Sequence, residues 1–210
     1  MKLYGYWRSS CSWRVRIALA YKNIPYTYEA VHLVRSGGEQ HALAHQERNP
    51  MAQVPSLLLE DGTYINQSLA IISYLESITP TPNLLGTTPK EKAWIWELSE
   101  MINAGTQPLQ NLSILQYVQE QFGGDKIEWG QHFISLGLDA FHKRIAQTNH
   151  LFCARDTISL ADLCLIPQLY NARRFSCSME RWPKLLEIES RCAEVTAFLD
   201  AHPDIQPDAQ

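Results

Sequence analysis

Apolar and polar positions in the first 80 residues follow strand-like and helical patterns in turn. Periodic runs at 11–22 and 68–78 predict helices, with a weaker helical pattern near 39–47. Short apolar runs predict strands at 2–6, 26–31, 56–60 and 63–66. The first two strands flank a helix and should be parallel, whereas Asp61-Gly62 predicts a hairpin between the last two. The pattern therefore predicts a βαβ unit followed by a ββα unit.

The pattern changes after residue 80. Prolines at 80, 82 and 89 interrupt a polar stretch that cannot continue a helix, so residues 81–88 are expected to link a domain over 1–80 to a second over 89–210. Pro108 should kink or end the first helix of the second domain. All later patterns are helical, over 89–121, 126–147, 159–171 and 182–200. We therefore expect an α/β domain followed by an all-α domain.

Composition argues against several classes of protein. The chain has 210 residues, 45% of them hydrophobic, and a net charge of −4. It lacks the basic excess that nucleic-acid binding requires. No apolar run approaches the roughly 20 residues of a membrane span, and no leader pattern is evident. Five cysteines without C-x-x-C spacing argue against a disulfide framework. We expect a cytoplasmic globular protein with no nucleic-acid or membrane partner.

The run Ser9-Ser10-Cys11-Ser12-Trp13-Arg14 stands where the first strand gives way to a helix. Unpaired N–H groups and the helix dipole favour an anion at such a position. A cysteine thiolate is such an anion, and nearby arginines lower its pKa. Arg8, Arg14 and Arg16 flank Cys11, although cations near a helix start disfavour the helix. We expect these arginines to attract a negative group; the alternative is that they are merely solvated.

Several other positions leave two interpretations open. Gln67-Ser68 opens the third helix and is either a carboxylate pocket or a plain N-cap. Val54-Pro55 precedes a strand, yet only about 5–6% of such bonds are cis, so trans is expected. His41 and His45 lack a third metal ligand, so no metal is predicted. The run from Ser159 to Asp162 predicts a capping box that is structural.

The segment from Ser9 to Leu19 resembles the signature of zeta-class glutathione transferases, and the likeness extends along nearly the whole chain. Further similar segments are 49–55, 67–72, 107–113 and 161–164. The resemblance implies the glutathione transferase fold: an α/β thioredoxin-like N-terminal domain that binds glutathione, and an all-α substrate domain. It also implies a homodimer. Arg155 departs from the family, in which glycine is usual, so a turn of positive φ would be strained there.

The resemblance also implies roles for individual residues. Ser10 would donate to the glutathione sulfur, supported by Ser9 and Cys11. The Val54-Pro55 bond would be cis, with the Val54 backbone pairing with the cysteinyl part of glutathione. The remaining contacts would come from Gln67 and Ser68 to the γ-glutamyl carboxylate, from Gln40 near the glycyl end, and from Gln107, Asn111 and Ser113 in the helical domain.

The implied reaction is a glutathione-dependent cis–trans isomerisation. Reversible thiolate addition would convert the dicarboxylate maleylacetoacetate to fumarylacetoacetate in tyrosine and phenylalanine catabolism. Arg8 and Arg174 are candidates to hold its carboxylates, with Arg173 as the alternative to Arg174. Other activities stay open: maleylpyruvate isomerisation, general glutathione conjugation, a monothiol redox reaction at Cys11, and non-catalytic binding on the same fold.

Overall fold

A computed structural model describes all residues, 1–210. The chain forms two compact units, one of residues 1–83 with 194–210 and the other of residues 84–193. The change between units lies at residues 83–84, and residues 194–210 fall in the first unit rather than with residues 84–193. Those residues pack with the first unit, where the buried Arg16 donates from Nε to the carbonyl of Ala201 at 3.2 Å.

The first unit contains a mixed four-stranded sheet. Its strands are β1 (Lys2–Gly5), β2 (Thr27–Ala30), β3 (Ser56–Leu58) and β4 (Tyr64–Asn66), in the order β2-β1-β3-β4. As predicted, β1 and β2 are parallel, and β3 and β4 form an antiparallel hairpin. Gly62 adopts φ +87° in the turn of this hairpin, a conformation that favours glycine.

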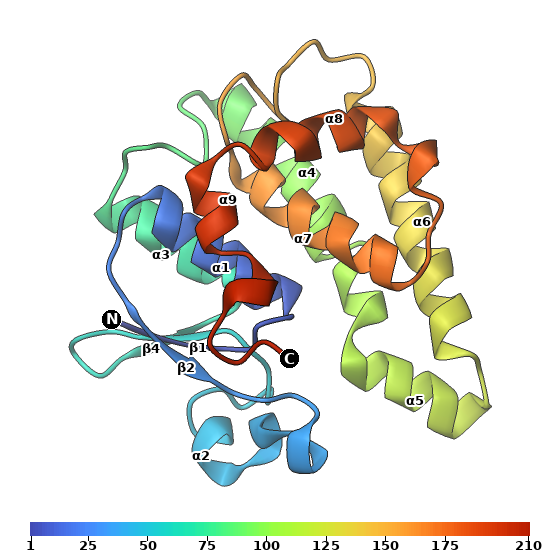
Figure 1. Ribbon diagram of the computed structural model, residues 1–210. Coiled ribbons are helices and arrows are strands. Elements are labelled where there is room, and N and C mark those ends of the chain that lie inside the picture. Colours follow the sequence, from blue (N-terminus) through green and yellow to red (C-terminus); the bar gives the residue numbers. More distant parts are fainter. The chain divides into compact units, whose positions relative to one another are not determined.

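Helices α1 (Ser10–Tyr21) and α3 (Ser68–Ile78) lie side by side on one face of the sheet, whereas α2 (Leu43–Gln46) lies on the other side (Figure 1). Successive side chains of each strand point to opposite faces of the sheet, so the side chains on one face pack against α1 and α3. The core contains fully buried side chains at Leu3, Val15, Ile17, Leu19, Leu57, Ile71, Ile72 and Leu75. Gly5 permits a close approach of β1 to α1, because a Cβ there would lie 3.2 Å from the Ser12 hydroxyl oxygen.

The second unit is helical, as predicted. It contains α4 (Pro89–Asn103), α5 (Leu112–Phe122), α6 (Lys126–Ile145), α7 (Leu160–Arg174) and α8 (Pro183–Cys192). The predicted helix over 89–121 is interrupted before Pro108, which lies in a short 3-10 turn, Gln107–Gln110. The predicted helix over 182–200 is also two helices, and its second part, α9 (Thr196–Asp200), belongs to the first unit. None of the helices has the length and apolar character needed to cross a bilayer.

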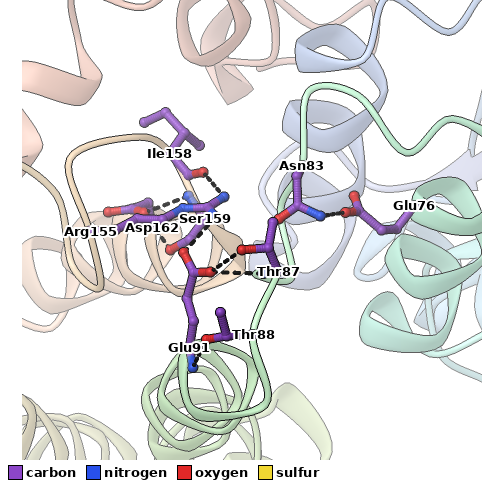
Figure 2. A network of polar contacts seen from close by, with 9 residues as sticks. All are labelled: Glu76, Asn83, Thr87, Thr88, Glu91, Arg155, Ile158, Ser159 and Asp162. Atoms are coloured by element: carbon purple, nitrogen blue, oxygen red, sulfur yellow. Dashed lines mark hydrogen bonds and ion pairs between the residues drawn. The ribbon is translucent and has the colours of Figure 1, made fainter.

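The predicted capping box at the start of α7 is present (Figure 2). Asp162 accepts hydrogen bonds from the N–H and the hydroxyl of Ser159, both at 2.8 Å, and from the N–H of Cys153 at 2.8 Å. The strain expected at Arg155 is absent, because its φ is not positive. Its guanidinium instead contacts Glu91 at 2.9 Å and the carbonyl of Ile158 at 3.0 Å, so arginine stabilises this turn.

Candidate active site

The strand-to-helix loop presents two serines in different roles. Ser9 is the N-cap of α1, and its hydroxyl accepts from the N–H of Ser12 at 3.2 Å. Ser10 is the first helical residue, and no other group of the protein engages its hydroxyl. The first N–H groups of a helix have no acceptor within it and carry its positive dipole end. This helix start is therefore suited to an anion, with Ser10 available as an additional donor and Cys11, partly exposed, next to it.

The three arginines near Cys11 do not share one role. Arg14 and Arg16 are fully buried, so the expectation that both attract an external anion is wrong. Arg16 donates to the carbonyls of Trp7 at 2.8 Å and Tyr6 at 3.4 Å, and burial lowers its pKa. Spacing along the chain could not show this, because the helix turns these two side chains inward. Arg8 alone is partly exposed, with its guanidinium 5.2 Å from the Trp7 ring.

The start of α3 forms a second anion-suited position. Gln67 precedes the helix with φ 71° and ψ 121°, a left-handed conformation that is uncommon for a residue with a side chain. Such strain is concentrated at functional sites, and nothing in the sequence predicts it. The exposed Gln67 amide lies 3.6 Å from the sulfur of Met51. Ser68 is buried and accepts from the Arg14 guanidinium at 3.5 Å, so this helix start is joined to α1.

The Val54-Pro55 bond is cis, as the resemblance implies and contrary to the expectation from X-Pro bonds in general. Neither the N–H nor the C=O of Val54 bonds to another group of the protein. Val54 packs in a buried cluster with Tyr6 and Trp7, the residues that lead into α1. Backbone polar groups normally find partners, so the Val54 peptide groups can pair with a peptide-like ligand beside the start of α1.

Gln40 lies buried in a 3-10 turn, Glu39–His41. Its amide nitrogen donates to the carbonyl of Leu33 at 3.3 Å, but its buried Oε1 has no partner. The ring of His32 holds the same segment, because its Nδ1 accepts from the N–H of Arg35 at 2.9 Å. A buried acceptor without a donor is unusual, so Gln40 has one unused hydrogen-bonding position.

In the second unit, the predicted residues lie around the start of α5. Gln107 donates to the side-chain oxygen of Asn111 at 3.5 Å, and Ser113, in the first turn of α5, is exposed. Asn111 is the N-cap of α5 but makes no side-chain capping bond. Sequence reasoning missed a buried amide pair nearby, in which Gln110 donates to Gln168 at 2.6 Å. The sequence signal for this pair is Gln168, a polar residue within the apolar run of α7.

The two adjacent arginines at the end of α7 differ in their partners. Arg173 makes a two-point contact with Glu189 of α8, at 2.6 and 2.5 Å. Arg174 contacts the neutral side-chain oxygen of Asn171 at 3.1 Å. Both side chains are exposed. The two-point fork of Arg173 is therefore already occupied by a carboxylate of the protein.

Comparison with known proteins identifies relatives along the full chain. Residues 8–78 match the family model described as glutathione S-transferase, N-terminal domain. The chain is 46% identical to the probable maleylacetoacetate isomerase 2 of Drosophila melanogaster, over 98% of this chain and 89% of that protein.

Two solved structures are also similar over the whole chain. The maleylacetoacetate isomerase of Anaeromyxobacter dehalogenans with bound glutathione has a TM-score of 0.90 and 44% identity, covering 100% of this chain and 97% of that one. A bacterial zeta-class maleylpyruvate isomerase has a TM-score of 0.95 and 36% identity, covering 100% of both chains. The Anaeromyxobacter protein has also been solved with dicarboxyethyl glutathione and citrate in its active site.

Proposed function

Because the chain belongs to the maleylacetoacetate isomerase family of zeta-class glutathione transferases, we propose that it is a glutathione-dependent cis–trans isomerase. Its substrate is maleylacetoacetate and its product fumarylacetoacetate. The observation that carries this proposal is the connection of two helix starts through Arg14: that of α1, which bears Ser10, and that of α3, which bears Ser68. Each offers unpaired N–H groups to an anion.

The unused polar groups of the first unit fit glutathione. The N-terminus of α3, with Gln67 and Ser68, suits the γ-glutamyl carboxylate, since a helix start binds carboxylates. The unpaired peptide groups of Val54 suit the cysteinyl backbone, and the unpartnered Oε1 of Gln40 suits a donor near the glycyl end. With glutathione held by these residues, its sulfur would lie at the start of α1.

The chemistry depends on stabilising a negative charge on that sulfur. When bound, glutathione supplies a thiolate that adds reversibly to the substrate alkene and so permits rotation about its carbon–carbon bond. The chain contributes the dipole of α1 and the Ser10 hydroxyl, together on the order of 1–2 kcal/mol, which lowers a thiol pKa from about 8.5 by roughly one unit. Ser9 supports the site by capping the helix, and Cys11 is adjacent to it.

The substrate carries two carboxylates, which guanidinium groups match in a two-point contact. Arg8 and Arg174 are the residues we assign to them, with Gln107, Asn111 and Ser113 lining the substrate side. Maleylpyruvate is the second candidate substrate, favoured by the likeness to the zeta-class maleylpyruvate isomerase. General glutathione conjugation would use the same groups of the first unit.

An assay of both maleyl compounds with and without glutathione tests the proposal. We expect isomerisation of maleylacetoacetate that requires glutathione and does not consume it. Ser10→Ala should lower kcat by about 100-fold, as expected for loss of one donor to a reacting anion, whereas Cys11→Ala should lose activity only in part. Isomerisation without glutathione, or failure with both substrates, would contradict the proposal. Steady consumption of glutathione would indicate conjugation instead.

We further propose a homodimer that acts in the cytoplasm, in tyrosine and phenylalanine catabolism. All five cysteines are free, which is consistent with a reducing compartment. Sedimentation of the purified chain tests the dimer, because a monomer at micromolar concentration would contradict it.

A further inference from the structure

The last residues of the chain reach the loop that leads into α1. Helix α9 packs against α1, and the ring of His202 meets the ring of Trp13 edge-on, with centroids 5.3 Å apart. Ala209 packs against the buried cluster that contains Tyr6 and Trp7. The C-terminal segment 194–210 is therefore part of the surroundings of Ser9 and Ser10, although it lies almost 200 positions away in sequence.

Asp208 and Arg16 together hold the backbone of Trp7 on both sides. The N–H of Trp7 donates to Oδ2 of Asp208 at 2.9 Å, and the C=O of Trp7 accepts from Nη2 of Arg16 at 2.8 Å. The carbonyl of Tyr6 accepts from Arg16 at 3.4 Å and from the N–H of Ser9 at 3.0 Å. The path of the chain into the N-cap of α1 thus depends on these two side chains.

The same pair also balances charge. Arg16 is fully buried, and a buried guanidinium needs an opposite charge because removal from water is costly. The negative charge of Asp208 acts on Arg16 across space, and Tyr28 interacts with both: its hydroxyl donates to Asp208 at 3.3 Å, and its ring lies 6.0 Å from the Arg16 guanidinium. Tyr26 also faces Arg16, but it is neutral at physiological pH. Loss of the carboxylate would leave a buried cation and an unpaired Trp7 N–H.

We propose that Asp208 is a positioning residue for the reaction, acting through Trp7 and Arg16 to fix the first turn of α1 and with it the hydroxyl of Ser10. This inference rests on the proposed function of Ser10. It assigns no contact between Asp208 and glutathione or substrate. Gln67 and Ser68 are joined to α1 through Arg14 rather than through the C-terminal segment, so affinity for glutathione should depend little on Asp208.

Substitution of Asp208 separates positioning from binding. Asp208→Ala removes the acceptor, and we expect kcat to fall about tenfold while KM for glutathione changes less than twofold. Asp208→Asn keeps an oxygen for the Trp7 N–H but removes the charge that faces Arg16, so kcat should lie between those of Asp208→Ala and the wild type. Asp204→Asn is the matched control, because this exposed carboxylate of the same segment contacts only His202, and its kcat should be that of the wild type. Wild-type kcat in Asp208→Ala, measured per folded molecule, would overturn the proposal.

A second variant and a measurement without substrate also test the positioning role of Asp208. If Asp208→Ala does not fold, Tyr28→Phe removes only the hydroxyl that donates to Asp208, and it should lower kcat two- to threefold with KM unchanged; an unchanged kcat would contradict the proposal. Hydrogen exchange of the amides of residues 7–13 needs no substrate. It should accelerate in Asp208→Ala and not in Asp204→Asn, and equal rates would overturn the positioning role even if the wild type proved not to be an isomerase.

Discussion

The guanidinium of Arg14 donates to the hydroxyl of Ser68 at 3.5 Å, and this buried contact joins the first turn of α3 to α1. Both helices begin at the same face of the sheet, and each has unpaired N–H groups at its start. Two positions suited to anions are therefore held at a defined separation. This arrangement matches a ligand that carries a carboxylate at one end and a thiolate in its middle.

Replacement of Ser68 should weaken glutathione binding more than it slows the reaction. Ser68→Ala removes a hydroxyl from the proposed carboxylate position, and a hydrogen bond to a charged group contributes about 1.5–3 kcal/mol. We expect KM for glutathione to rise at least tenfold, with kcat changed less than threefold. Ser77→Ala, on the exposed last turn of the same helix, is the control and should leave both constants unchanged. A wild-type KM in Ser68→Ala would exclude this residue from the binding site.

The adjacent arginines of α7 can be distinguished by a matched pair of variants. Arg174→Gln should raise KM for the dicarboxylate substrate about tenfold, since a carboxylate loses its two-point partner. Arg173→Gln breaks only the contact with Glu189, which is partly exposed, and should cost less than about 1 kcal/mol of unfolding free energy with no change in KM. The opposite pattern of KM values would assign the substrate to Arg173.

The pair formed by Lys22 and Glu76 should dominate the stability of the first unit. The Lys22 ammonium lies 2.6 Å from Glu76, has no solvent exposure, and also donates to the carbonyls of Thr79 and Pro82. Lys22→Met should lower the unfolding free energy by about 3–5 kcal/mol, because it removes the cation that faces the buried carboxylate of Glu76. Lys2→Met breaks an exposed pair with Glu29 and should leave the unfolding free energy almost unchanged, because solvent screens that pair. Equal midpoints of urea unfolding for the two variants would refute this difference.

The ionisation of the Glu91 carboxylate should make the free energy of unfolding depend on pH in the acidic range. Its carboxylate accepts from the N–H of Thr87 and contacts Arg155, and these interactions lower the pKa of Glu91 from 4.5 to about 2 (Figure 2). A carboxylate with a lowered pKa in the folded state stabilises the protein above its unfolded pKa, and this contribution is lost as pH falls from about 4.5 through about 2.

Substitution of Glu91 tests this linkage. Glu91→Gln should lower the unfolding free energy at pH 7 by roughly 1 kcal/mol, since the pair is partly exposed and solvent screens it. The difference from the wild type should shrink as the pH approaches 2. Parallel stability curves for the two proteins between pH 7 and pH 2 would contradict the assignment.

Much of the fold could be predicted from local pattern. The strands of the first unit, the Asp61-Gly62 hairpin, the parallel pairing of β1 with β2 and the capping box at Ser159 all follow from signals within a few residues. The resemblance to zeta-class glutathione transferases led to the fold class, which is confirmed. The roles of Ser10, Val54, Gln67 and the other site residues stay predictions. In the structure each of these residues has polar groups that could bind a ligand.

The sequence by itself determined most of the helices and strands and several of their caps, because periodicity and caps are local properties. Only the tertiary structure decided what those residues face. Arg14 and Arg16 looked like an external anion site but are buried, and Arg16 bonds to Ala201, 185 positions away. Asp208 likewise reaches Trp7 across 201 positions. Such contacts arise only when distant segments pack together, and no spacing along the chain encodes them.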